Sequence, residues 1–188
     1  MAVMTQKALG DALIKLLSKK PLSRITVNDI VEECGLARQT FYYHFKDIYD
    51  LLEWTIETGA SEALKKEECL NVKERLNVIL SAAQKNKKAF HNIYISIGRE
   101  PLENYFERQI YEMYFEQIKS AYANTNVPPK EAEFLVSFYT KGLTCLLLDW
   151  IRDGMKLSAK EFTSKIDLLF KKELILPICK EAEERLKR

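Results

Sequence analysis

Residues 26–52 have the sequence TVNDIVEECGLARQTFYYHFKDIYDLL, and two short helical patterns lie within them. Thr26 stands before apolar residues at helical spacing, with Asp29 three positions later, which is the pattern of a capping box. Gly35 predicts the end of this helix, because glycine adopts the left-handed conformation of a helix C-terminus without steric cost. The apolar pattern then restarts over residues 37–45. Two short helices joined by a tight, glycine-containing turn indicate a helix-turn-helix.

The outward face of the second helix carries side chains suited to DNA. At helical spacing it holds Gln39, Tyr42, Tyr43 and Lys46, with Arg38, Thr40 and His44 beside them. No acid occurs between Glu33 and Asp47, although the chain has 27 acidic residues against 29 basic ones. A local positive surface of this kind is what a phosphate backbone requires. We therefore expect this helix to contact DNA.

The rest of the chain has the patterns of a helical bundle. Only 6 glycines and 5 prolines occur in 188 residues, whereas an all-β fold needs more turn residues. Apolar spacing predicts further helices over residues 9–20, 47–64, 71–86, 88–97, 102–123, 129–153 and 158–172, and a weakly specified one over 177–186. We predict an all-α fold with an N-terminal three-helix DNA-binding domain, containing the helix-turn-helix, at residues 1–48. Residues 49–188 would form a C-terminal helical bundle that dimerises.

One predicted helix suggests how the chain would dimerise. Residues 129–153 are apolar nearly all round, so this helix must be buried on more than one side. One stripe can pack within the protomer while the other meets a second protomer, and Gly142 leaves room for a close helix approach. The alternative is that both stripes belong to the core of one chain. We expect a homodimer formed through helices 129–153 and 158–172.

Charge and composition exclude several other classes of protein. The net charge is +2, so a DNA-binding surface must be local. The N-terminal residues lack the uninterrupted apolar stretch of a signal peptide, and no segment approaches the roughly 20 apolar residues of a membrane span. We therefore expect a cytoplasmic protein. The 4 cysteines are widely spaced, without CxxC or a neighbouring histidine, and three of them lie at apolar positions of helical patterns. We therefore expect small apolar core residues, with a redox-sensor or metal role as the alternative.

A catalytic function has little support in the sequence. The chain has 2 histidines and no HExxH, glycine-rich phosphate loop or GxSxG motif, so we predict no enzymatic activity and no cofactor. Another alternative is a helical interaction module whose helix-turn-helix is degenerate. The presence of Tyr42, His44 and Lys46 argues against that alternative.

Residues 26–52 resemble the DNA-binding signature of the TetR family of bacterial transcription regulators. The likeness is close over the first quarter of the chain, and TFYYHF at residues 40–45 is its most specific element. The remainder is similar to the family only in architecture, as an all-helical ligand-binding and dimerisation domain. RQTFYYHFKDIYDLLEW at residues 38–54 and WIRDGM at residues 150–155 are similar to a subgroup that includes the activator of dihydroxyacetone kinase operons.

The resemblance implies a role for each residue of the DNA-binding surface. Thr26 would cap its helix and touch a phosphate, and Lys46 would add a phosphate contact. Tyr42 and His44 would contact backbone phosphates and the thymine-rich edge of the groove. Bases would be read at the positions that the family varies, here Arg38, Gln39, Thr40 and Tyr43. Arginine suits guanine and glutamine suits adenine. Ile48 stands where the family commonly has lysine, which removes one phosphate contact.

The resemblance also implies how the protein is regulated. Most such proteins are repressors that bind a palindromic operator as a homodimer and are released by a small-molecule effector. The effector pocket would lie among the middle helices, where the candidate lining residues are His91, Tyr94, Tyr114 and Tyr139. Aromatic residues at helical spacing can equally belong to the core. The alternative mode of regulation is an activator, or a regulator controlled by a partner protein.

Overall fold

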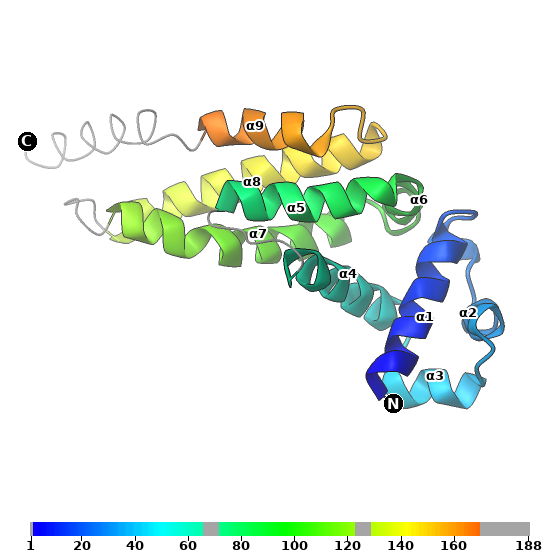
Figure 1. Cartoon of the computed structure of the whole chain (residues 1–188). Coiled ribbons are helices and arrows are strands. Elements are labelled where there is room, and N and C mark those ends of the chain that lie inside the picture. The colour runs from blue at the N-terminus through cyan, green and yellow to red at the C-terminus, as the bar shows by residue number, and fades with distance from the viewer. Residues whose placement is uncertain (1, 66–71, 123–128, 170–188) are drawn as a thin grey trace, which may run out of the picture.

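The computed structural model describes residues 2–65, 72–122 and 129–169, and these residues form helices without any strand (Figure 1). The prediction of an all-α fold is therefore confirmed. The described helices are α1 (Ala2–Leu17), the 3-10 helix η1 (Leu22–Arg24), α2 (Val27–Cys34), α3 (Arg38–His44), α4 (Ile48–Lys65), α5 (Val72–Lys85), α6 (Lys87–Ile97), α7 (Arg99–Tyr122), α8 (Pro129–Arg152) and α9 (Ala159–Leu169).

The first three α-helices pack around a shared apolar core. Leu13 of α1, Ile30 of α2 and Phe41 of α3 are fully buried within it. Phe45, just after α3, meets Trp54 of α4 edge to face, with 5.6 Å between the ring centroids. This packing holds α3 at the end of the molecule opposite α9 (Figure 1).

α4 connects the N-terminal helices to the bundle. It slants from the region of α1 toward the bundle in Figure 1, and Leu51 and Leu52 in its first turns are buried with α1, α2 and α3. Within the bundle, α7 packs along α8 and α5 packs along α9. α4 is thus in contact with both the N-terminal helices and the bundle.

The apolar core crosses the boundary predicted near residue 48. Ala89 and Ile93 of α6 and Leu148 of α8 belong to the same cluster as the buried side chains of α1 to α4. The Asn92 side chain donates a hydrogen bond to the carbonyl oxygen of Leu17 at 2.8 Å. α6 thus ties the end of α1 to the bundle. The division into residues 1–48 and 49–188 stays a prediction.

A second core cluster holds the bundle together at the connection between α8 and α9. The Trp150 ring stacks on Phe162, with 5.0 Å between the centroids, and its Nε1 donates to the carbonyl oxygen of Leu157 at 3.0 Å. Gln84 of α5 donates to the same oxygen at 2.9 Å and accepts from the Ala159 N–H at 2.9 Å. These bonds fix the start of α9 against α5.

Some predicted boundaries differ from the observed ones. α7 begins at Arg99, before the predicted start at residue 102. Pro101 lies in its first turn, where the missing N–H would have had no intrahelical acceptor. α1 extends back to Ala2, and η1 was not predicted. The helix predicted over residues 177–186, and residues 170–172 of the predicted dimer helix, lie outside the described residues.

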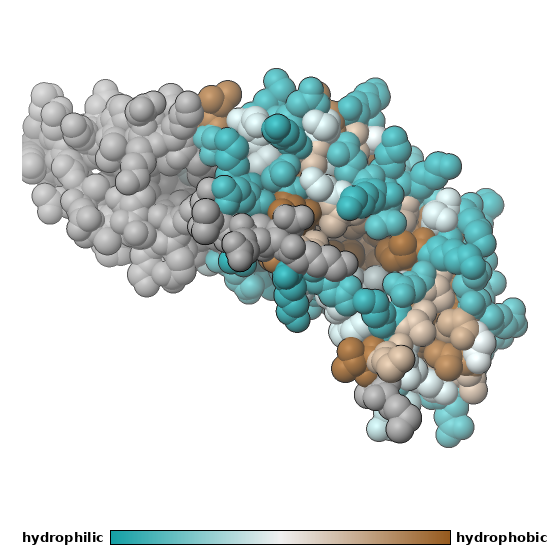
Figure 2. All heavy atoms as spheres, in the orientation of Figure 1, coloured by the Kyte–Doolittle hydropathy of each residue, from teal (hydrophilic) through white to brown (hydrophobic). Residues whose placement is uncertain are grey.

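The described surface of the bundle is mainly hydrophilic on the face shown in Figure 2, with smaller hydrophobic areas over the N-terminal helices. Among the described helices, none is long and apolar enough to cross a membrane. The described residues also contain no group of three His, Cys, Asp or Glu side chains that could hold a metal ion.

The described cysteines occupy two different environments. Cys34 is half-buried and burial raises the pKa of its thiol, in line with a small apolar residue. Cys145 is exposed, so the prediction of an apolar environment is wrong at this position, because this side of α8 faces outward in the single chain. Its Sγ lies 2.8 Å from Nη2 of Arg99. Cys69 and Cys179 lie outside the described residues.

Candidate nucleic-acid interface

Hydrogen bonds at both ends of α2 fix the turn that leads into α3. The Thr26 hydroxyl accepts from the N–H of Asp29 at 3.2 Å, and the Asp29 carboxylate accepts from the N–H of Thr26 at 2.7 Å, so the predicted capping box is confirmed. Gly35 has a φ of 68°, the left-handed conformation that its position predicts. The N–H of Leu36 donates to the carbonyl oxygen of Val31 at 2.8 Å. This Schellman arrangement ends α2.

Lysines of α1 and of the segment after it compensate two of the three acids of α2. Lys20 Nζ lies 3.0 Å from Oδ2 of Asp29, and Lys15 pairs with Glu33. The hydrogen bond from the Thr26 N–H, followed by the one from Lys20, lowers the pKa of Asp29 to about 2. Lys15 likewise lowers the pKa of Glu33. The charges of Asp29 and Glu33 are therefore compensated, and Glu32 is the remaining acid of α2.

α3 has one buried and one exposed face, as its spacing predicts. Phe41 and Phe45 lie in the core, whereas Tyr42 is 49% and Tyr43 is 82% exposed. The remaining residues predicted to contact DNA from this region are exposed or partly exposed: Arg38, Gln39, Thr40, His44 and Lys46. The structure therefore leaves the whole predicted set on and beside α3 accessible to a ligand as large as DNA.

Contacts among the exposed side chains order the surface of α3. Arg38 donates to the Asn28 side-chain oxygen and to the Tyr42 hydroxyl, each at 3.2 Å, and its guanidinium carbon lies 5.5 Å from the Tyr42 ring centroid. The Tyr43 ring meets His44 edge to face at 4.9 Å. Sequence reasoning missed Asn28, which positions Arg38 from α2. Its place two residues after the Thr26 cap, on the exposed side of the first turn, was the available signal.

The Thr26 hydroxyl is already engaged in the capping box. It donates to Oδ2 of Asp29 at 2.8 Å and accepts from the Asp29 N–H. A hydroxyl has one proton, so it cannot donate to a phosphate while it keeps this bond. Backbone N–H groups in the first turn of a helix have no intrahelical acceptor and favour anions. The backbone around Thr26 is therefore better placed for a phosphate contact than its side chain.

The start of α4 fixes the backbone that carries Lys46. Asp47 accepts from the N–H groups of Tyr49 and Asp50 at 2.9 Å each, which makes it the cap of α4. The N–H of Lys46 donates to the Asp50 carboxylate at 2.9 Å. Ile48 packs against the N-terminal core, which accounts for an apolar residue where the family commonly has lysine.

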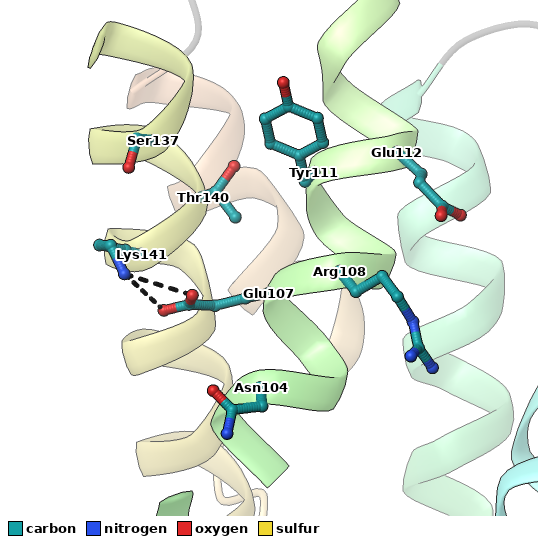
Figure 3. Close-up of a pocket in the computed structure, with 8 residues that line it drawn as sticks. All are labelled: Asn104, Glu107, Arg108, Tyr111, Glu112, Ser137, Thr140 and Lys141. Atoms are coloured by element: carbon teal, nitrogen blue, oxygen red, sulfur yellow. Dashed lines mark hydrogen bonds and ion pairs between the residues drawn. The ribbon is translucent and has the colours of Figure 1, made fainter. Parts of the chain in front are cut away.

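The residues predicted to bind an effector lie on different helices. His91 of α6 has a buried Nδ1 without a hydrogen-bond partner. Tyr94 of α6 packs against both core clusters, and Tyr139 of α8 packs against one of them. The side chain of Tyr114 lies outside the described part of the chain. A groove of about 350 Å³ lies between α7 and α8 (Figure 3), and His91, Tyr94 and Tyr139 do not line it. Their role stays a prediction.

The fold and the α3 surface together define a helix-turn-helix DNA-binding protein. Residues 9–54 match the model described as bacterial regulatory proteins, tetR family, and residues 71–172 match the model described as transcriptional regulator C-terminal region. The second match alone covers more than half of the chain. The chain belongs to the TetR family of DNA-binding transcriptional regulators, which act as dimers and are not enzymes.

Individual proteins are similar to this chain in sequence or in fold. The HTH-type dhaKLM operon transcriptional activator DhaS of Lactococcus lactis subsp. lactis (strain IL1403) is 25% identical over 95 residues, which are 50% of this chain and 51% of that protein. This chain thus spans about half the length of that relative in the match. The solved structure of a dihydroxyacetone kinase operon activator DhaS has a TM-score of 0.71 at 22% identity, over 95% of this chain and 97% of that one. A TetR transcriptional regulator from Streptococcus agalactiae 2603V has a TM-score of 0.62 at 21% identity, over 88% and 92%.

Proposed function

We propose that this regulator binds a palindromic operator as a homodimer, with α3 of each protomer in the major groove. The accessible, acid-free surface of α3 carries the DNA half of the proposal. Two such helices must lie roughly 34 Å apart to meet successive turns of the duplex. Tyr42, His44 and Lys46 would bind the backbone, and Arg38 and Gln39 would read bases. Thr40 and Tyr43 complete the reading surface.

An unused apolar face on α8 supports the homodimer. Phe134, Phe138 and Leu146 are 72%, 64% and 44% exposed, and they share one side of the helix at spacings of four and eight residues. Gly142 lies between the last two on the same side, and no atom lies within 4 Å of the position that a Cβ would take there. On α9, Leu168 is 52% exposed. A row of exposed apolar side chains of this kind marks a surface that another protein covers.

Sedimentation equilibrium tests this interface. Phe138→Asp places a charge on the apolar face of α8, so we expect a monomer where the wild-type protein is a dimer. Met4→Asp is the matched control, because Met4 is 78% exposed on α1 and this substitution adds the same charge away from α8. We expect Met4→Asp to stay dimeric. A Phe138→Asp variant that stays dimeric would contradict the proposed interface.

We further propose that the protein is a repressor that a small-molecule effector releases from DNA. Occupying an operator that overlaps a promoter is enough to block transcription, so this output needs no contact beyond those of α3 and the dimer. The continuous core through α6, α4 and α1 gives an effector a route to change the position of α3. Transcription from a promoter carrying the selected operator, in a purified system, tests the sign: repression is expected, and activation would overturn it.

The second candidate is an activator, or a regulator controlled by a partner protein. The observation in its favour is the name of the relative from Lactococcus lactis, a transcriptional activator. The same purified transcription assay separates the two, because an activator raises the transcript level. A requirement for a second protein before any DNA is bound would favour control by a partner.

A further inference from the structure

Arg38 is held by two side chains, one on α2 and one on α3. Its Nη1 donates to Oδ1 of Asn28, and its Nη2 donates to the Tyr42 hydroxyl, each at 3.2 Å. The guanidinium carbon also lies 5.5 Å from the centroid of the Tyr42 ring, within the distance of a cation–π contact. Contacts from two helices therefore restrict a side chain that is otherwise among the most flexible in proteins.

Both hydrogen-bond partners of Arg38 are uncharged, which distinguishes it from three other arginines of the described helices. Those three each pair with a carboxylate: Arg99 with Asp149, Arg108 with Glu53, and Arg152 with Asp153. A carboxylate compensates the charge of the guanidinium that it holds, and it also repels a phosphate backbone. An amide and a phenol instead fix the position of the Arg38 side chain and leave its positive charge uncompensated.

These contacts leave the Arg38 side chain able to bind a base. A guanidinium has five N–H donors, and Asn28 and Tyr42 accept from two of them. The remaining three are enough for the two hydrogen bonds that an arginine makes to O6 and N7 of guanine. Arg38 is exposed and is the first residue of α3. The N-terminal residues of a recognition helix are the ones that contact base edges.

We propose that Asn28 is a specificity-determining residue outside α3, because it holds the Arg38 guanidinium in the position that reads a guanine in each half of the operator. This inference rests on the proposed function, since it needs a protein that reads bases with α3. Asn28 is a positioning residue and acts through Arg38. Tyr42 contributes to the same arrangement: its hydroxyl accepts from Arg38, which leaves the hydroxyl proton free to be donated to a phosphate.

Preorganisation is the physical reason why Asn28 affects specificity. Ordering a flexible side chain on binding lowers affinity, and this loss is smaller when the side chain is already held in its binding position. Without Asn28, the Arg38 side chain samples more rotamers and has to be ordered when it meets the base. Only the complex with guanine uses the ordered guanidinium. The loss therefore falls on guanine relative to the other bases, and not equally on every DNA sequence.

Competition binding between the full-length protein and duplexes that vary one base pair of the selected operator tests the inference. Arg38→Ala first identifies the base pair that Arg38 reads, as the position where a preference for guanine of about five- to a hundredfold is lost. Asn28→Ala should lower the preference at that same position by about two- to tenfold and leave the other positions unchanged. Asn86→Ala is the matched control, because Asn86 is exposed between α5 and α6 and its side chain makes no capping bond.

The double variant shows whether Asn28 acts through Arg38. In the Arg38→Ala protein, adding Asn28→Ala should change the base preference no further, because the side chain that Asn28 positions is gone. An equal effect of Asn28→Ala with and without Arg38 would overturn the inference, as would an unchanged preference in the Asn28→Ala protein. Asn28→Asp keeps the acceptor, so it should keep the preference for guanine, while its charge weakens binding to every sequence.

NMR of the arginine side chains tests the positioning itself in the protein alone. The Nε–H group of Arg38 should show restricted motion on the picosecond to nanosecond timescale in the wild-type protein and greater motion in Asn28→Ala. Asn86→Ala should match the wild-type protein. Equal mobility of Arg38 in the wild-type and Asn28→Ala proteins would overturn the inference. Because Asn28 is exposed, the melting temperature of Asn28→Ala should stay close to that of the wild-type protein, which excludes a general loss of folding.

The same binding data separate this inference from the proposed function. A base preference that is lost in Arg38→Ala and kept in Asn28→Ala refutes the role of Asn28 alone. Base preferences that all survive Arg38→Ala remove Arg38 from the reading surface and overturn the inference, while operator binding by the dimer stands. A wild-type protein that prefers no DNA sequence refutes the proposed function and the inference with it.

Discussion

α3 and α8 each present a surface that the single chain does not use, and the two surfaces differ in chemistry. α3 exposes tyrosine, arginine and glutamine side chains over a buried phenylalanine face. α8 exposes phenylalanine and leucine over a buried face that includes Val136 and Leu143. A polar, acid-free surface fits a polyanion, whereas an apolar one fits a second apolar surface. The buried face of each helix determines how that helix packs in the fold. The residue types on its exposed face determine which kind of partner it can bind.

The largest expected effect is a loss of folding stability from a substitution on the buried face of α3. Phe41→Ala should lower the free energy of unfolding by about 3–5 kcal/mol, because it opens a cavity in the N-terminal core. Tyr43→Ala, on the outer face of the same helix, should change it by no more than about 0.5 kcal/mol. Urea denaturation of both variants measures the difference. Equal losses from the two substitutions would show that the two faces are wrongly assigned.

A substitution on the exposed face of α3 tests whether this face determines the DNA sequence preference. Gln39→Ala should alter the preference at particular base pairs by about 1–3 kcal/mol, because it removes a bidentate contact to a base edge. Competition binding with operator variants measures this effect, and Lys160→Ala, on the exposed side of α9, is the control. An unchanged preference in the Gln39→Ala protein would remove Gln39 from the reading surface.

A substitution in the turn before α3 should have a smaller effect on folding stability. Gly35→Ala places a Cβ on a residue with a φ of 68°, which should cost about 1–2 kcal/mol of folding stability. Gly59→Ala is the matched control inside α4, where the added methyl group meets no atom within 4 Å and should stabilise the helix by about 0.5–1 kcal/mol. Thermal or urea unfolding distinguishes the two signs. A neutral Gly35→Ala variant would mean that the turn is not set by this residue.

The smallest expected effect is the loss of folding stability at low pH that comes from the capping boxes of α2 and α9. At α9, the Ser158 hydroxyl donates to Glu161 at 2.6 Å and the Ser158 N–H donates to it at 2.9 Å, and these two bonds lower the pKa of Glu161. The Thr26 contacts lower the pKa of Asp29 in the same way. A lowered pKa adds stability above the unfolded-state value, near pH 4, and that stability is lost as the pH falls toward 2. Asp29→Asn should flatten this acid loss more than Glu161→Gln, because the pKa of Asp29 is lowered further, to about 2. Unfolding curves across this pH range provide the measurement, and a steeper acid loss in either variant would contradict the assignment.

The sequence predicted the helix-turn-helix in detail because its determinants are local. The Thr26 cap, the Gly35 stop and the inward position of Phe41 each depend on residues within one or two turns, and all three are confirmed. The capping box that begins α9 likewise depends only on Ser158 and Glu161, three residues apart. Local rules of this kind need no knowledge of the rest of the fold.

Features that depend on tertiary packing were beyond the sequence. Whether Cys145 and Phe138 lie in a core or on a surface depends on which side of α8 meets α7, and apolar spacing is the same in both cases. The Asn28 contact to Arg38 joins two helices, and the groove between α7 and α8 exists only when these two helices are packed. The predicted DNA contacts and effector residues stay predictions for the same reason: they concern molecules beyond this chain.

In vitro selection from random duplex DNA, performed with the purified full-length protein at two salt concentrations, tests the central claim most directly. The account predicts an enriched palindrome whose half-sites lie about one helical turn apart, bound more weakly at the higher salt because phosphate contacts release counterions. Failure to enrich any sequence, with background binding that does not change with salt, would contradict the assignment of α3 as a DNA-reading surface.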